Sequence, residues 1–208
     1  MGQASAPGRE RSLVYSGPLP LILASRSPRR QEILSRLGVV FEVRPADIDE
    51  TANPEVPPRE QAMSVAARKA ATVARDLRRG LVLGADTVVV LGSEVFGKPA
   101  DAAGARRMLA RLAGRTHVVT TGLALIDVER GVRCLAWEDT RVRMRPLSED
   151  EIAAYVATGE ALDKAGAYAI QGHGAVLIDS IDGCYYNVMG LPVVRLLSML
   201  RDMEGQGS

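Results

Sequence analysis

The sequence has few cysteines, histidines and aromatic residues. Among 208 residues there are two cysteines and two histidines, and aromatic residues make up 4%. Cys134 and Cys184 lie far apart and form neither a disulfide framework nor a zinc-binding pattern, so we expect a protein of the reducing cytoplasm. His117 and His173 are isolated, which argues against zinc hydrolysis and against a Ser-His-Asp triad.

The sequence also lacks long hydrophobic runs and an excess of charge of one sign. The hydrophobic stretch before Ser25 is too short to span a membrane. A net charge of +1 gives no overall field that attracts nucleic acid or a membrane surface. No basic stripe is interleaved with aromatic residues, and there is no Walker loop or Gly-x-Gly-x-x-Gly motif. We therefore expect neither nucleic acid nor a membrane as a partner.

Lysine is scarce although basic residues are not. Of the 26 basic residues only three are lysines, namely Lys69, Lys98 and Lys164. A surface ion pair accepts arginine or lysine equally well, whereas a compact charge on a flexible stem is harder to replace. Each lysine is therefore a candidate functional residue.

Residues 21–38 are typical of a strand followed by a helix, and the first helical turn carries an unfavourable charge. Ser27 suits the N-cap and Pro28 the first helical position. Arg29 and Arg30 then lie where the helix dipole already places partial positive charge. An anion bound at this end would remove the conflict, and we interpret the segment as a phosphate-binding site. The alternative is a pair of solvated arginines on a surface helix.

Carboxylates occur in two segments where their charge needs an explanation. Residues 47–51 contain three acidic side chains, Glu50 among them, and form either a solvated loop or a ligand set for a divalent metal. Asp86 lies within the hydrophobic run 81–91, where a carboxylate is costly unless it is paired or bound to a metal. The alternative for Asp86 is a turn between two strands.

The helix that begins at Pro58 carries a lysine within a hydrophobic stripe. Val65, Lys69 and Val73 recur at intervals of four and lie along one side of the helix. The amine of Lys69 either extends along the surface to water or brings a positive charge into a cleft.

Strand and helix patterns alternate along the chain, but a hairpin interrupts them. Residues 116–128 and 132–145 are typical of two strands joined by a turn, and residues 175–181 of a further strand. We expect an α/β fold with a mixed twisted sheet flanked by helices. The chain divides into a disordered N-terminal extension (1–18), one catalytic domain (19–202) and a frayed tail (203–208).

Basic residues around an anion site, together with isolated carboxylates, suit metal-assisted phosphoryl chemistry. Positive groups neutralise the phosphates, carboxylates hold ions such as Mg²⁺, and one carboxylate activates water.

Six short segments between about Leu21 and Leu200 carry a family resemblance. They are Ser25-Arg26-Ser27-Pro28-Arg29-Arg30, Asp49-Glu50-Thr51, Gly84-Ala85-Asp86-Thr87, Gly97-Lys98-Pro99, Asp163-Lys164-Ala165-Gly166 and Asn187-Val188-Met189-Gly190-Leu191-Pro192. In this order they resemble the motifs of the Maf family of nucleoside triphosphate pyrophosphatases, once described as septum-formation inhibitors. The resemblance implies hydrolysis of a nucleoside triphosphate to the monophosphate and pyrophosphate with a divalent cation, Mg²⁺ or Mn²⁺. It also implies two lobes around a central cleft, similar to the inosine triphosphate pyrophosphatases, and a homodimer.

The resemblance further implies roles for individual residues. Asp86 is the expected general base or metal ligand, and Glu50 is the second position associated with metal. The residues expected to bind the substrate and its phosphates are Ser25, Arg29, Arg30, Lys69, Lys98 and Lys164. Arg29, Thr87 and Gln171 match the branch of the family that prefers dTTP and UTP. A glutamine amide, which offers both a donor and an acceptor, suits the O4–N3 edge of thymine or uracil.

Two departures from the family pattern lie near the expected base pocket. Ala169 replaces a frequent glycine, and residues 184–186 are Cys-Tyr-Tyr where Gly-Ser-Tyr is more usual. We expect an enzyme that removes non-canonical or surplus pyrimidine triphosphates from the nucleotide pool, with a link to arrest of cell division. The alternative is a non-catalytic nucleotide-binding regulator of septum formation, which would not need the full set of charged residues.

Overall fold

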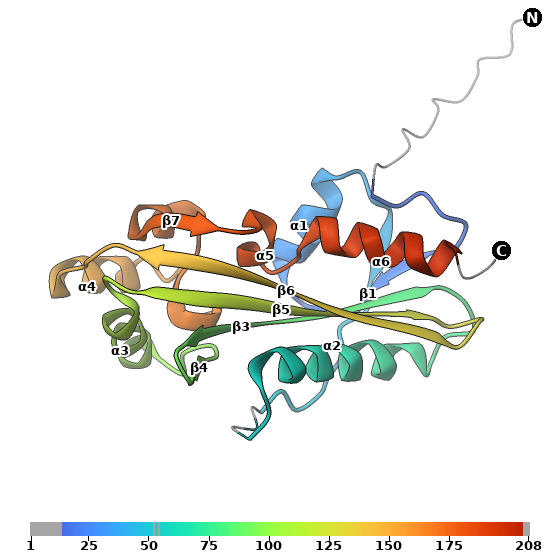
Figure 1. Cartoon of the computed structure of the whole chain (residues 1–208), viewed down its shortest axis with the longest axis horizontal. Coiled ribbons are helices and arrows are strands. Elements are labelled where there is room, and N and C mark those ends of the chain that lie inside the picture. Colours follow the sequence, from blue (N-terminus) through green and yellow to red (C-terminus); the bar gives the residue numbers. More distant parts are fainter. Residues whose placement is uncertain (1–13, 52, 54, 206–208) are drawn as a thin grey trace, which may run out of the picture.

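A seven-stranded mixed sheet forms the centre of the protein in a computed structural model that describes residues 14–51, 53 and 55–205 (Figure 1). The strands are β1 (Leu21–Leu23), β2 (Phe41–Val43), β3 (Leu81–Leu91), β4 (Glu94–Phe96), β5 (Thr116–Asp127), β6 (Val132–Met144) and β7 (Ile178–Asp182). Their order is β2-β1-β3-β5-β6-β7, with β4 paired to β3. β1 runs parallel to β2 and β3, whereas the other pairs are antiparallel. The expected mixed sheet and the hairpin of β5 and β6 are confirmed.

Helices cover both faces of the sheet. They are α1 (Pro28–Arg36), α2 (Pro58–Ala74), α3 (Ala102–Leu112), α4 (Glu149–Ala157), α5 (Tyr185–Met189) and α6 (Val193–Gly205), with 3₁₀ segments η1 (Ala165–Ala167) and η2 (Gly172–Leu177). In Figure 1, α2 lies along one face, and α1 and α6 lie on the other. Alternate residues of β1 follow this division, because Leu21 and Leu23 pack with α1 and α6 while Ile22 packs with α2. No described helix is long and hydrophobic enough to cross a membrane.

The hydrophobic core is divided along strand β3. Leu81 and Leu83 belong to the core beneath α1 and α6, whereas Val89 belongs to a second core with α3 and α4. Asp86 and Thr87 lie between the two cores and are only partly buried. The expected alternative of a turn at this point is wrong, since β3 continues through Asp86 and pairs with β5 along its length. The two lobes therefore meet at a polar segment of one continuous strand.

Two glycines allow α2 to lie directly on the sheet. A Cβ atom on Gly84 would lie 2.1 Å from the carbonyl oxygen of Ala66, and one on Gly122 would lie 2.3 Å from the carbonyl carbon of Ala62. Both neighbours are backbone atoms of α2, which cannot give way as a flexible side chain can. Close contact with α2 therefore depends on the absence of a side chain at these two positions of β3 and β5.

Three expected boundaries differ from the structure. Residues 172–177 form η2 and not a strand, so β7 begins at Ile178. Of the expected N-terminal extension, residues 1–13 lie outside the described residues, but Val14 and Tyr15 are buried in the core beneath α6. Met203 is buried in the same core, and 206–208 lie outside the described residues.

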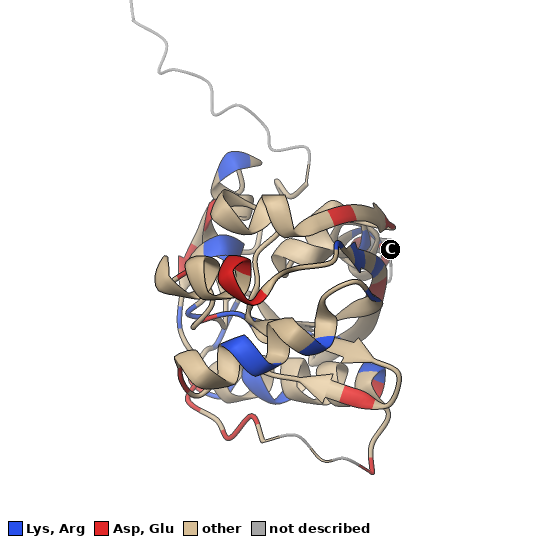
Figure 2. Ribbon diagram, turned by 90° about the vertical axis from the view of Figure 1, so that its left-hand side faces the viewer, with Lys and Arg blue, Asp and Glu red and all other residues tan. Residues whose placement is uncertain are grey.

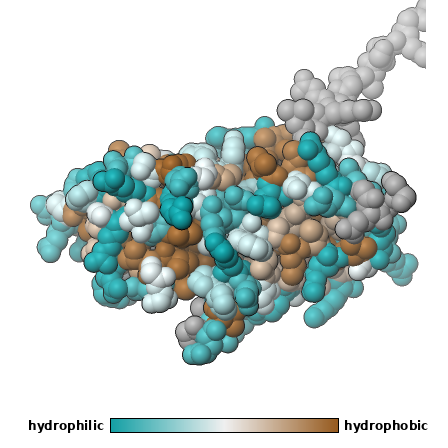
Figure 3. Space-filling view, in the orientation of Figure 1, coloured by the Kyte–Doolittle hydropathy of each residue, from teal (hydrophilic) through white to brown (hydrophobic). Residues whose placement is uncertain are grey.

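The chain has 26 basic and 25 acidic residues, and its net charge is only +1. Figure 2 shows basic and acidic residues interspersed around the end of the sheet that it views. On the face in Figure 3, hydrophobic residues form patches separated by hydrophilic ones. Any attraction for an anionic ligand must therefore come from a local arrangement of charges.

We expect Gly84→Ala to lower the free energy of unfolding by about 3 kcal/mol, because the added methyl group forces α2 away from β3. Gly97→Ala is the matched control, since a Cβ there meets no atom of the described chain within 4 Å. Urea denaturation measures both variants. Equal midpoints for Gly84→Ala and wild type would show that α2 does not need this close contact.

Candidate active site

A cavity of about 650 Å³ lies where the two lobes meet. Nine of the ten residues singled out in the sequence line it, namely Ser25, Arg29, Arg30, Glu50, Lys69, Asp86, Thr87, Lys98 and Lys164. The tenth, Gln171, lines a smaller neighbouring cavity of about 200 Å³. Arg29 and Lys164 border both cavities.

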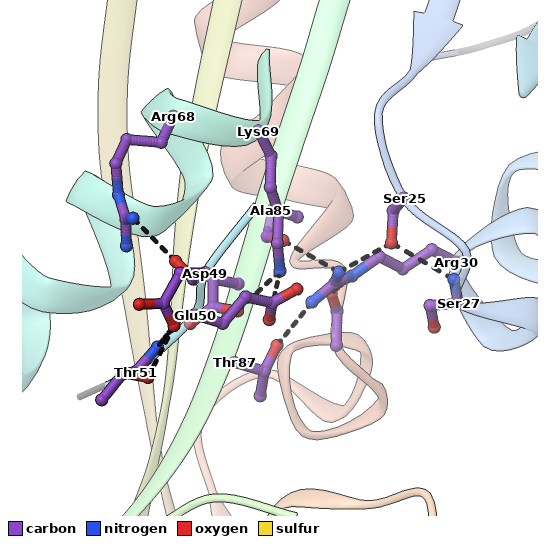
Figure 4. A network of polar contacts seen from close by, with 12 residues as sticks. Ser25, Ser27, Arg30, Asp49, Glu50, Thr51, Arg68, Lys69, Ala85 and Thr87 are labelled. Atoms are coloured by element: carbon purple, nitrogen blue, oxygen red, sulfur yellow. Dashed lines mark hydrogen bonds and ion pairs between the residues drawn. The ribbon is translucent and has the colours of Figure 1, made fainter. Parts of the chain in front are cut away.

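The ammonium group of Lys69 lies between two carboxylates (Figure 4). Its Nζ is 2.8 Å from Oε2 of Glu50 and 2.9 Å from Oδ1 of Asp86. The side chain of Lys69 is only 8% exposed and that of Asp86 14%, so both charges are largely removed from water. Of the two interpretations of Lys69, the structure supports the one in which it brings charge into a cleft.

Helix α2 holds the acidic loop through two neighbouring basic residues. Arg68 donates a hydrogen bond to the carbonyl oxygen of Asp49 at 2.7 Å, while Lys69 binds the carboxylate of Glu50. Burial acts to raise the pKa of Glu50, but the hydrogen bond and the charge of Lys69 outweigh it, so that pKa is lowered. Glu50 is thus held as an anion at the edge of the cavity.

Arg30 is buried, so the alternative of a pair of solvated arginines is wrong for this residue. Its Nε donates to the carbonyl oxygen of Gly190 at 2.7 Å, and its Nη1 donates to Ala85 O at 2.9 Å and Ser25 Oγ at 3.0 Å. Its Nη2 donates to Thr87 Oγ1 at 3.0 Å. Burial lowers the pKa of Arg30. The guanidinium group therefore ties α1, β3 and the turn after α5 together beneath the cavity.

The beginning of α1 opens on the cavity with free positive charge. Helix α1 starts at Pro28 after Ser27, as predicted, but the Ser27 side chain makes no capping hydrogen bond. Within the part of the chain that the structure describes, no ion pair or hydrogen bond engages the side chains of Arg29 and Lys98. The backbone N–H groups of the first turn and these two side chains are therefore available to an anion.

Lys164 and Thr87 have internal partners. Lys164 Nζ donates to Asp163 Oδ1 and to the carbonyl oxygen of Glu160, both at 2.6 Å. Thr87 Oγ1 accepts from Arg30 and lies 2.9 Å from Thr121 Oγ1. The structure does not bring Thr87 and Gln171 into one cavity, although both were expected to select the base.

Sequence reasoning missed several residues that line the cavity. Gln61 is buried on α2, eight residues before Lys69, and the same interval of four that marked the lysine could have identified it. Tyr168, the residue after η1, is buried and also lines the cavity. No local signal marked it, because a single tyrosine in a loop is ordinary.

A basic cavity with two converging carboxylates, set between the lobes of a mixed α/β sheet, is typical of enzymes that act on polyphosphates. The chain belongs to the family described as Maf-like proteins, whose model matches residues 20–203.

Curated relatives match nearly the whole chain. A protein of Desulforamulus reducens is 48% identical over 88% of this chain and 95% of its own length. A protein of Moorella thermoacetica is 51% identical over 86% and 93%, and one of Symbiobacterium thermophilum 52% identical over 86% and 92%. All three are named dTTP/UTP pyrophosphatase.

One solved structure to which the chain is similar is a nucleoside-triphosphatase, dITP/XTP pyrophosphatase, of Mycobacterium abscessus. The TM-score is 0.40 and the identity 15%, over 62% of this chain and 76% of that one. A likeness this low carries no weight for the site.

We expect Arg30→Ala to destabilise the protein by about 3 kcal/mol or more, because buried acceptors from three segments lose their donor. Arg29→Ala is the matched control, since the neighbouring side chain is partly exposed, and we expect a change within about 0.5 kcal/mol. Urea denaturation of the two variants distinguishes them. Identical midpoints would mean that Arg30 does not hold the segments together.

Proposed function

We propose that this protein hydrolyses nucleoside triphosphates to the monophosphate and pyrophosphate, with dTTP and UTP as the preferred substrates. The observation that carries the proposal is the buried Lys69 ammonium between Glu50 and Asp86, in a cavity that is also lined by Arg29 and Lys98, whose side chains have no ion pair or hydrogen bond among the described residues. The name of the three relatives, dTTP/UTP pyrophosphatase, supports the same reaction and the same nucleotides.

The triphosphate binds at the basic side of the larger cavity. Among the described residues, Arg29, Lys98 and the free N–H groups at the start of α1 offer positive charge without an internal partner. Lys164 borders both cavities and contributes charge where the phosphates meet the nucleoside. Arg30 and Ser25 act beneath this surface, where their hydrogen bonds fix the start of α1 relative to β3.

Asp86 activates the attacking water. Its carboxylate lies in the middle of a rigid strand and is oriented by the hydrogen bond from Lys69. It accepts a proton as the water oxygen bonds to phosphorus, and the bond from phosphorus to the pyrophosphate oxygen breaks. Lys69, Arg29 and Lys98 stabilise the negative charge that develops on the phosphate oxygens.

The residues present fit a divalent cation that is shared with the substrate. Glu50 and Asp86 already converge on one cation, the Lys69 ammonium, and carboxylate oxygens are the ligands that Mg²⁺ and Mn²⁺ prefer. Among the described residues no group of three acidic, histidine or cysteine side chains could hold a metal alone, so Glu50 and Asp86 would hold the ion together with ligands supplied by the substrate and water. When bound, the ion neutralises phosphate charge and lowers the pKa of water.

Gln171 recognises the base by hydrogen bonding in the smaller cavity. Arg29 borders both cavities and connects base recognition to phosphate binding. Thr87 faces Arg30 and Thr121, so it influences specificity by positioning these groups. Homodimer formation and a cytoplasmic location stay predictions, as does the absence of nucleic-acid and membrane partners.

A non-catalytic regulator of septum formation is the less favoured function. A protein that only binds a nucleotide needs basic side chains for the phosphates. It does not need a carboxylate such as that of Asp86, which is 14% exposed, placed against Lys69, because such a group is costly to desolvate.

The test of the proposed function is release of pyrophosphate from a panel of canonical and modified triphosphates with Mg²⁺, Mn²⁺ or a chelator. We expect activity with either metal, loss of activity with the chelator, and the highest kcat/KM for dTTP and UTP. Binding of nucleotides without pyrophosphate release under any condition would favour the regulator.

We expect Asp86→Asn to lower kcat by roughly 10²–10⁴-fold, because the amide has nearly the size of the carboxylate but cannot accept the proton. Asp182→Asn is the control, since that carboxylate is on β7 and its side chain is 80% exposed. Steady-state kinetics with UTP measure both. Turnover near that of wild type in Asp86→Asn would assign the base to another residue.

We expect wild-type enzyme to have a higher kcat/KM for UTP than for CTP and Gln171→Glu to reduce this ratio by about 10-fold, because the carboxylate no longer donates a hydrogen bond to O4. Gln31→Glu introduces the same charge on α1 without lining either cavity and serves as the control. A wild-type ratio near one would remove Gln171 from base recognition, as would a ratio that the mutation leaves unchanged.

A further inference from the structure

The loop that carries Gln171 contains backbone conformations that need contacts from other parts of the protein to hold them. Over residues 165–174, which we call the base loop, Gly166 and Gly172 have φ values of 69° and 62°. Ala167 has a φ of 59°, a left-handed conformation that is strained for a residue with a side chain. Such a conformation persists only where surrounding groups hold it.

The carboxylate of Glu160 holds the base loop on the C-terminal side of Gln171. Oε1 accepts a hydrogen bond from the backbone N–H of His173 at 3.0 Å, and Oε2 accepts one from Gly174 at 3.2 Å. Burial acts to raise the pKa of Glu160, but these two backbone hydrogen bonds outweigh it and lower that pKa. Glu160 also borders the smaller cavity beside Gln171.

Tyr155 holds the base loop on the N-terminal side of Gln171. Its buried hydroxyl group accepts a hydrogen bond from the backbone N–H of Ala169 at 3.1 Å. The hydroxyl group of Tyr168, the residue before Ala169, lies 2.7 Å from Nε2 of His117. This buried contact anchors the first part of the base loop in the core. Gln171 therefore lies midway between two fixed points, each two residues away.

The base loop has a glycine, Gly172, at the position that lies against the Glu160 carboxylate. A Cβ atom on Gly172 would lie 2.4 Å from Oε1 of Glu160, so a side chain at this position would displace the carboxylate. Gly172 is also in the left-handed conformation that glycine adopts without strain. The position of the Glu160 carboxylate therefore depends on glycine at position 172, and the turn after Gln171 depends on the hydrogen bonds that this carboxylate accepts.

We propose that Glu160 is a positioning residue for base selection, which it achieves by fixing the base loop so that Gln171 faces the smaller cavity. This inference rests on the proposed function, because it assigns the origin of base specificity within that site. Glu160 does not touch the base. It sets the position of the amide that does, and a hydrogen-bonded site discriminates between bases only when its groups are held in place.

The test compares Glu160→Gln with Glu149→Gln, which makes the same change on the exposed first turn of α4. In Glu160→Gln the amide nitrogen replaces one of the two accepting oxygens and meets a backbone N–H group. We expect the kcat/KM ratio of UTP to CTP to fall about 10-fold through a higher KM for UTP, with kcat within about twofold of wild type. Inhibition by inorganic triphosphate should not change, because the phosphate side of the cavity is intact.

Hydrogen exchange provides the second readout. The amides of residues 169–174 should exchange faster in Glu160→Gln than in wild type and in Glu149→Gln. An unchanged nucleotide ratio overturns the proposal, and so does an equal loss for UTP, CTP and inorganic triphosphate, which would show a general structural role. If Glu160→Gln does not fold, Tyr155→Phe removes the other anchor while keeping the ring, and the same results are required of it.

Failure of the proposed function has a different signature. Wild-type protein that releases no pyrophosphate from any triphosphate contradicts the enzyme but still allows the affinities for UTP and CTP to be compared by calorimetry. The inference is then upheld only if Glu160→Gln lowers the preference for UTP in binding and accelerates exchange in the base loop, and it is overturned otherwise.

Discussion

A single buried ammonium group, that of Lys69, is the constraint on which the rest of the structure depends. Two charges of a buried ion pair must satisfy each other, because removing either partner leaves a charge that cannot be hydrated. Lys69 meets this requirement with Asp86 on β3 and Glu50 on the preceding loop. The contact can form only if α2 lies close to the sheet, and the glycines Gly84 and Gly122 make that approach possible.

A second buried cation, Arg30 on α1, contacts the same strand and works in the opposite way. Arg30 has its donors taken up by backbone carbonyl and hydroxyl oxygens, so its charge supports the frame of the site. Arg29, the residue before it, has no internal partner in the part of the chain that the structure describes. Neighbouring arginines thus have separate tasks because consecutive side chains at the start of a helix point in different directions.

The two adjoining cavities suggest how one site can separate reaction from recognition. The larger cavity contains the carboxylates and most of the basic groups, while the smaller one contains Gln171. Two relatives of this chain are named dTTP/UTP pyrophosphatase. In the proposed arrangement, phosphate chemistry depends on rigid elements such as β3 and α2, and base recognition depends on a loop that must be anchored from α4 and the residues after it.

The sequence by itself determined the features that local chemistry controls. The start of α1 at Pro28, the hairpin of β5 and β6 and the selection of Lys69 as a candidate residue all followed from the sequence, because capping preferences, turn spacing and hydrophobic periodicity depend on residues close along the chain. Only the tertiary structure decided that Arg30 is buried and that Gln171 lies in a cavity apart from Thr87. These outcomes depend on contacts between residues far apart in sequence, such as Arg30 with the carbonyl oxygen of Gly190, and no local pattern specifies which distant groups meet.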